Sequence, residues 1–155
     1  MIKLKPIKEM FPEVKMDDYN EYVEGIDYDD ILEYFADILI SVSDKDYQGD
    51  TRYLIRDRED GRIGISIIGW GSCTACDELQ GCESFEELEE LILHIVNSIK
   101  WFDNAKECLY YLNNHDWKGD HLWYDTSKKW TKKFIKRSKQ YIYDNYCLII
   151  SMKKR

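Results

Sequence analysis

Two stretches of alternating residues joined by a short turn constrain the fold of this 155-residue chain more than any other feature. Residues 51–57 alternate between polar and apolar side chains, and the alternation resumes over residues 62–68. The dipeptide Asp60-Gly61 between them is typical of tight hairpin turns. We therefore expect an antiparallel hairpin over about 51–57/62–68. In its second strand Gly64 and Ser66 share one face and leave room for a close neighbour.

Helical periodicity surrounds this hairpin. Apolar residues recur at helical spacing in four segments, which predicts helices over about 28–43, 84–99, 104–115 and 127–143. Asp27 is a candidate N-cap for the first helix, and Ser84 with Glu87 forms a capping-box pattern for the second. Residues 146–151 predict a further strand. The expected fold is one α+β domain spanning residues 1–155, with a small antiparallel sheet packed against about four helices.

The segment between the hairpin and the 84–99 helix has the most unusual composition. It reads Gly69-Trp70-Gly71-Ser72-Cys73-Thr74-Ala75-Cys76-Asp77-Glu78-Leu79-Gln80-Gly81-Cys82. Two thiolates at C-x-x-C spacing can share one tetrahedral zinc ion, and Cys82 is a candidate third ligand. Simple packing of small apolar side chains in a tight turn explains the cysteines as well. A thiol redox role is the third interpretation, although both prolines precede the motif, where a thioredoxin-like site needs one after it.

Other candidates for chemistry are weaker. His115, Asp116, Asp120 and His121 lie within seven residues and could bind a metal or transfer protons, but a solvated loop explains them more simply. The sequence contains no nucleotide-binding, hydrolase or deaminase motif. We therefore assign no catalytic residue and favour a protein that is not an enzyme. A zinc- or thiol-dependent enzyme centred on Cys73, Cys76 and Cys82 stays open as an alternative, with either one zinc ion or no cofactor.

Charge is divided unevenly along the chain. Residues 1–125 carry 12 Lys/Arg against 29 Asp/Glu, whereas residues 126–155 carry 10 Lys/Arg against one acid. Within the predicted 127–143 helix, Lys128, Lys132 and Lys136 form one i, i+4 ladder and Lys129, Lys133 and Arg137 form another. Like charges at this spacing destabilise a helix, so an opposing anionic surface is expected. That surface is the protein's own acidic body, an acidic partner or nucleic acid. Direct nucleic-acid binding is expected only through this helix.

Four stretches of the chain resemble an uncharacterised family of small bacteriophage proteins. They are Tyr47-Gln48-Gly49-Asp50-Thr51, the run Gly69-Trp70-Gly71-Ser72-Cys73-x-x-Cys76-Asp77-x-Leu79-Gln80-x-Cys82, Trp101-Phe102-Asp103 and His115-Asp116-Trp117-x-Gly119-Asp120. The resemblance covers about residues 45–124. It implies a phage or prophage gene product that acts in the cytoplasm of a bacterial host. Small acidic phage proteins of this kind often occupy a host protein, and CRISPR effectors are frequent targets.

Together these features predict a phage-derived, non-enzymatic inhibitor of a host protein, with a CRISPR or other anti-phage defence complex as the first candidate. An acidic and aromatic surface would make the contact. The alternatives are the zinc- or thiol-dependent enzyme and a nucleic-acid binder that uses helix 127–143. No apolar run is long enough for a membrane span, so no membrane partner is expected. The candidate partner-binding residues are Trp70, Asp77, Glu78, Trp117, Asp120, Lys129, Lys133 and Arg137.

Overall fold

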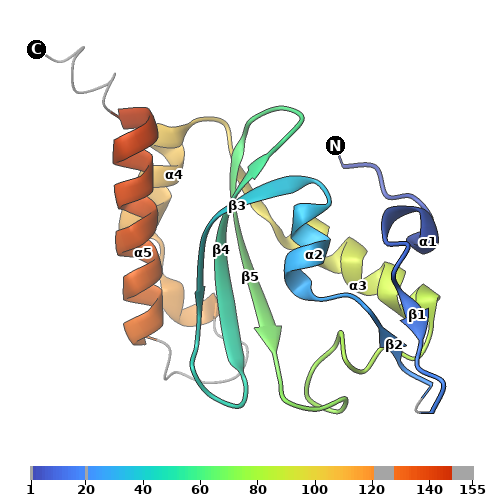
Figure 1. Cartoon of the computed structure of the whole chain (residues 1–155). Helices are drawn as coiled ribbons and strands as arrows, with labels where there is room; N and C mark the ends of the chain where they lie inside the picture. The colour runs from blue at the N-terminus through green and yellow to red at the C-terminus, as the bar shows by residue number, and fades with distance from the viewer. Residues whose placement is uncertain (1, 20, 121–127, 148–155) are drawn as a thin grey trace, which may run out of the picture.

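A four-stranded antiparallel sheet lies between two layers of helices (Figure 1). The computed structural model describes residues 2–19, 21–120 and 128–147. The sheet has the order β3 (Ala36–Ser43), β4 (Gly49–Asp57), β5 (Ile63–Trp70) and β6 (Lys100–Phe102). One side of it is covered by α2 (Tyr28–Glu33) and α3 (Phe85–Ser98), and the other by α4 (Ala105–Asn114) and α5 (Lys128–Ile142). The α+β prediction is confirmed.

The predicted hairpin is present as β4 and β5; β4 begins two residues earlier than expected, and β5 ends two residues later. The strands pair from Gly49 opposite Trp70 to Arg56 opposite Ile63. The connection spans residues 58–62, more than the two residues that Asp60-Gly61 suggested. The Asp57 carboxylate stabilises it by accepting a hydrogen bond from the Glu59 amide at 2.8 Å. On the face expected to admit a close neighbour, the Trp101 ring packs directly over Gly64.

The predicted 28–43 helix is wrong over most of its length. The helix begins as expected, because Asp27 and Asp30 form a reciprocal capping box, but it ends at Glu33. Residues 36–43 are strand β3, which pairs with β4 along its whole length. A bulge between Ile38 and Ile40 moves later side chains to the other face of the sheet. A bulged strand therefore places apolar residues on both sides, and the resulting pattern imitates helical spacing.

Two hydrophobic clusters hold the layers together. The first joins β4 and β5 to α2, α3 and the N-terminal segment, which contributes α1 (Ile7–Met10) and the two-stranded sheet of β1 (Lys15–Met16) and β2 (Val23–Glu24). The second cluster lies between the opposite face of the sheet and helices α4 and α5. In α3 the buried positions follow the expected stripe: they are Leu88, Leu91, Ile92 and Ile95. Ser84 caps this helix by accepting from the Glu87 amide.

The C-terminal end departs from expectation. The described part of the predicted 146–151 strand, residues 146 and 147, belongs to a π-helical turn, η2 (Tyr143–Cys147), that continues α5. Residues 148–151 of that strand and Ser127, the expected helix start, lie outside the described residues. A 3₁₀ turn, η1 (Trp117–Asp120), follows α4. Among the residues described, no helix has the length and apolar character needed to span a membrane.

Candidate functional site

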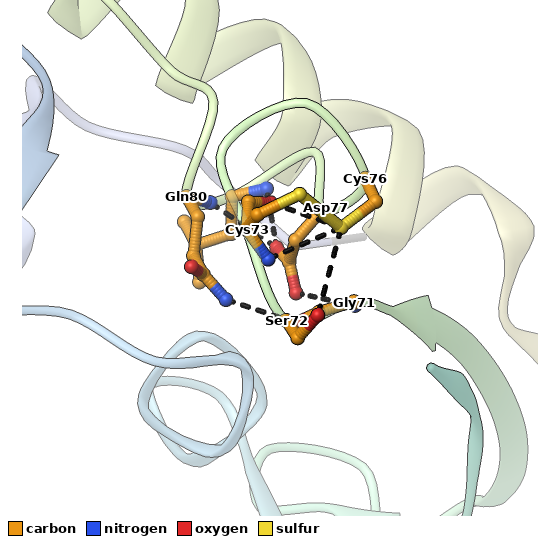
Figure 2. The surroundings of a disulfide bond; sticks show 7 residues. Gly71, Ser72, Cys73, Cys76, Asp77 and Gln80 are labelled. Carbon is orange, nitrogen blue, oxygen red and sulfur yellow. Dashed lines mark hydrogen bonds between the residues drawn. A yellow bond between two sulfur atoms is a disulfide. The ribbon is translucent and has the colours of Figure 1, made fainter. Parts of the chain in front are cut away.

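Asp77 organises the loop that connects β5 to α3 (Figure 2). Its side chain is only 5% exposed. Oδ1 accepts hydrogen bonds from the Tyr28 hydroxyl (2.8 Å), the Leu79 amide (3.0 Å) and the Gln80 amide (3.1 Å), and Oδ2 accepts from the Gly71 amide (2.9 Å). Burial raises the pKa of the Tyr28 hydroxyl, which keeps it a proton donor to the carboxylate. Asp77 is therefore a structural residue, and its predicted role in partner binding is not supported.

The two cysteines of the C-x-x-C motif are joined by a disulfide, where the sequence favoured free thiols or metal ligands. A tight turn, in which the Cys76 amide donates to the Cys73 carbonyl at 3.1 Å, brings their Cα atoms to 5.4 Å. This separation lies within the range that a disulfide spans. Gly71 lies so close to the Cys76 carbonyl that a Cβ at this position would overlap it. The tight fold of this loop therefore brings Cys73 and Cys76 close together.

Cys82 does not join the other two cysteines. It is buried, and its thiol donates to the Glu78 carbonyl at 3.2 Å. Burial, with the negative charge of nearby Glu87, raises the pKa of the Cys82 thiol to about 11. No group of three or more His, Cys, Asp or Glu side chains suited to a metal ion occurs in the part of the chain that the structure describes. The zinc site on Cys73, Cys76 and Cys82 stays a prediction, and this geometry does not favour it.

A groove separates the 71–82 loop from α3. It consists of two adjoining hollows of about 550 and 410 Å³, which share the lining residues Cys76, Glu78, Leu91 and His94. Glu78 and His94 are both exposed. His94 was not predicted as a site residue, because its neighbours in the sequence are apolar and suggest a packed position. It nevertheless lies outside the buried stripe of α3, directly before the buried Ile95. Helical periodicity alone therefore predicts that the His94 side chain is exposed.

The exposed side of α3 carries a dense negative charge. We call the exposed residues Glu86, Glu87, Glu89, Glu90, Leu93 and His94 the acidic α3 face. On the flank away from the 71–82 loop lies a third hollow of about 780 Å³. The N-terminal segment lines it with Leu4, Lys5 and Met10, and α3 lines it with Glu86, Glu89 and Glu90. Leu93, 49% exposed, lies at its edge. The acidic α3 face is thus a ridge with a hollow on each flank, and both hollows are lined by apolar and charged residues together.

A basic surface lies on the opposite side of the sheet. Helix α5 packs its apolar stripe, centred on Phe134 and Ile142, onto the sheet. Its other side exposes six cations, which we call the basic α5 face: Lys128, Lys129, Lys132, Lys133, Lys136 and Arg137. The ion pairs found in the described ranges include none of these six residues. Helix α5 therefore docks on its own sheet through apolar contacts and leaves its charge facing outward.

Buried Arg52 of β4 fixes α5 to the sheet. The side chain is 1% exposed, its Nε donates to Thr131 Oγ1 at 2.9 Å, and its guanidinium pairs with the Asp44 carboxylate at 3.0 Å. A buried arginine is tolerated only with such partners, because an unpaired buried charge is costly. This contact orients the helix so that the basic α5 face points away from the core.

The histidine-rich segment after α4 is packed more tightly than a solvated loop. His115 stacks on Tyr111 with ring centroids 4.3 Å apart, and Trp117 meets both of them edge-on. The Asp116 carboxylate accepts a hydrogen bond from the Lys118 amide. His121 lies outside the described residues, so the metal or proton-transfer site considered for residues 115–121 stays untested. The aromatic stack gives His115 a packing role.

The predicted partner-binding residues fall into separate groups. Glu78 is exposed in the groove, whereas Trp70, at the end of β5, and Trp117 are half-buried. For Asp120 the side chain lies outside what the structure describes. Three residues are exposed together on the basic α5 face: Lys129, Lys133 and Arg137. The exposed candidates therefore lie on two separate surfaces: Glu78 beside α3, and the three cations on α5, on the opposite side of the sheet (Figure 1).

The fold and surfaces define a small α+β protein with two oppositely charged helical faces. Comparison of the chain with protein-family models, with curated proteins and with solved structures finds no match. The resemblance to small bacteriophage proteins therefore stays a prediction.

Proposed function

We propose that this is a phage-derived, non-enzymatic protein that binds a host protein through the acidic α3 face and blocks it. The observation that carries the proposal is the combination of four exposed glutamates with partly apolar hollows along one ridge. Charge complementarity selects a basic partner surface, and apolar contacts in the hollows would supply affinity. Nucleic-acid-binding channels are the most basic surfaces that proteins commonly present.

The specific form of the proposal is a CRISPR or other anti-phage defence complex whose nucleic-acid channel the acidic α3 face occupies. Glu86, Glu89 and Glu90 would stand in for backbone phosphates, which also carry one negative charge each at short intervals. Leu93 and the adjoining hollow would distinguish this partner from other basic proteins, because phosphate mimicry alone is not selective. Phage origin and the identity of the complex come from the resemblance and are part of the proposal.

A two-stage experiment tests this function. The protein is immobilised and used to capture partners from bacterial lysate at several salt concentrations. Each stoichiometric partner is then purified and its nucleic-acid binding is measured with and without the protein. We expect the wild-type protein to prevent nucleic-acid loading. Failure to capture any stoichiometric partner at any salt, or capture without loss of nucleic-acid binding, would contradict the proposal.

Charge-reversal variants locate the contact. Glu86→Lys/Glu90→Lys alters the acidic α3 face and should weaken inhibition by at least about tenfold, because opposing charges become like charges at a close interface. Glu33→Lys/Glu59→Lys makes the same change in net charge at exposed positions outside α3 and serves as the matched control. Equal loss in both variants would show that net charge, rather than this face, determines binding.

A further inference from the structure

The basic α5 face combines cations with aromatic rings in an order that suits a particular class of ligand. Near its start, three ammonium groups surround the half-buried ring of Trp130: those of Lys129 at 4.9 Å, Lys45 at 5.3 Å and Lys133 at 5.4 Å from the ring centroid. Lys45 comes from the β3–β4 connection, so the tryptophan joins that loop to the helix. Three like charges are thereby gathered around one ring.

A basic hollow lies further along the same helix. It has a volume of about 330 Å³ and is lined by Lys132, Lys136 and Lys139 together with Gln140 and Tyr143. Tyr143 is 46% exposed, so its ring is available for contact. Helix α5 itself contains no acidic residue, and the Asp144 carboxylate just beyond its end accepts a hydrogen bond from the Gln140 amide at 2.8 Å. The hollow therefore offers the positive charge of three lysines and an aromatic surface in one place.

The spacing of these features fits an extended polyanion. Trp130 and Tyr143 are separated by thirteen residues, which corresponds to about 20 Å along a helix. One nucleic-acid strand in a duplex carries a phosphate about every 3.4 Å, so this length matches about six phosphates. Proteins that bind single strands alternate cations with aromatic rings in this manner, since bases stack on the rings while phosphates meet the cations.

We propose that the basic α5 face, extended by Lys45, binds the phosphodiester backbone of nucleic acid independently of the acidic α3 face. The sheet separates the two faces, so the negative charge of α3 does not lie beside the proposed ligand. The self-repulsion of the lysine ladders is offset when phosphates lie against them. An acidic protein would satisfy the charges but would leave the exposed Tyr143 ring without a stacking partner.

The test is fluorescence anisotropy of labelled 20-nucleotide single strands and 20-base-pair duplexes with the full chain at 50 to 200 mM salt. Contacts from about four cations predict that the logarithm of the binding constant falls with the logarithm of salt with a slope of about −3. The two probes separate a single strand from a duplex as the source of the phosphates. No binding at the lowest salt, or a flat salt response, would overturn the proposal.

Matched variants locate the surface. Lys129→Gln/Lys133→Gln should weaken binding by about tenfold at low salt and reduce the steepness of the single-strand slope by about 1.4, because two phosphate contacts are lost. Lys3→Gln/Lys5→Gln removes the same charge from exposed positions in the N-terminal segment, on the other side of the sheet, and should leave both quantities unchanged. Equal effects of the two variants would overturn the assignment to α5. Circular dichroism of each variant verifies that the fold is retained.

Two further measurements address competing occupants. Poly-glutamate that displaces the labelled strand as effectively as unlabelled nucleic acid would overturn the proposal in favour of an acidic protein ligand. Sedimentation that shows self-association at low salt, abolished by either Lys129→Gln/Lys133→Gln or Glu86→Lys/Glu90→Lys, would overturn it in favour of a second copy of this chain. We expect the protein to sediment as a monomer, and we expect poly-glutamate not to displace the labelled strand.

Discussion

Replacing Asp77 with alanine should destabilise the protein by about 3 kcal/mol, because the loop loses the acceptor around which it is folded. The buried Gly71 amide would be left without its carboxylate acceptor, which costs about 1–3 kcal/mol. The Leu79 amide keeps a hydrogen bond to the Tyr28 oxygen, and the exposed Gln80 can turn to water. These two groups and the Tyr28 hydroxyl add smaller losses.

Urea titration followed by far-ultraviolet circular dichroism and tryptophan fluorescence measures this free energy. For a chain of this length the same loss lowers Tm by about 6–12 °C. Glu78→Ala is the matched control, because Glu78 is the next residue, is exposed and should change stability by less than about 0.5 kcal/mol. If Asp77→Ala stays within that margin, or if Glu78→Ala costs as much, the carboxylate does not organise the loop.

Three further predictions concern the core and the helix caps. Burial raises the pKa of Cys82 to about 11 and of Cys108 to about 12, so neither of these two thiols should react with a thiol reagent in the native protein at pH 8, which peptide mapping after labelling can check. Because these values lie above the ordinary 9.0, the stability that these two thiols contribute is complete below about pH 9 and is lost as the pH rises through 11 to 12, which alkaline melting curves can follow. Arg52→Met should cost about 3–5 kcal/mol by leaving Asp44 unpaired, and Arg52→Met/Asp44→Asn should recover part of it; additive losses in urea titrations would argue against the pair. Ser84→Ala should cost about 1 kcal/mol through loss of the α3 cap, and an unchanged urea midpoint would show that water replaces it.

The elements predicted well from sequence are those whose signals are local. The hairpin carries both its alternation and its turn residues within twenty positions, and α3 carries a cap at Ser84 followed by an uninterrupted apolar stripe. The prediction failed for β3 because this segment is a strand through its pairing with β4, and that contact is made with residues outside the segment itself. Its β-branched residues Ile38, Ile40 and Val42 favoured a strand, but the bulge removed the alternation that would have revealed it.

The candidate site shows the same limit. The C-x-x-C motif was found from its spacing, yet the role of Asp77 depends on Tyr28, which lies 49 residues earlier in the chain. No local pattern connects these two residues. The groove likewise depends on how the 71–82 loop folds back against α3, which brings Glu78 close to His94. By contrast, the basic α5 face was predicted from its two ladders, because charges on one helix are arranged by helical periodicity alone.

The arrangement of α3 and α5 on opposite sides of the sheet makes the folded chain a strong electric dipole. The net charge of −8 does not determine how the protein interacts with a charged surface, because that surface contacts only one face at a time. The protein should be retained by both anion- and cation-exchange resins at neutral pH, each resin holding it by a different side. In the field of a charged macromolecule it would rotate before contact, so it should arrive already oriented.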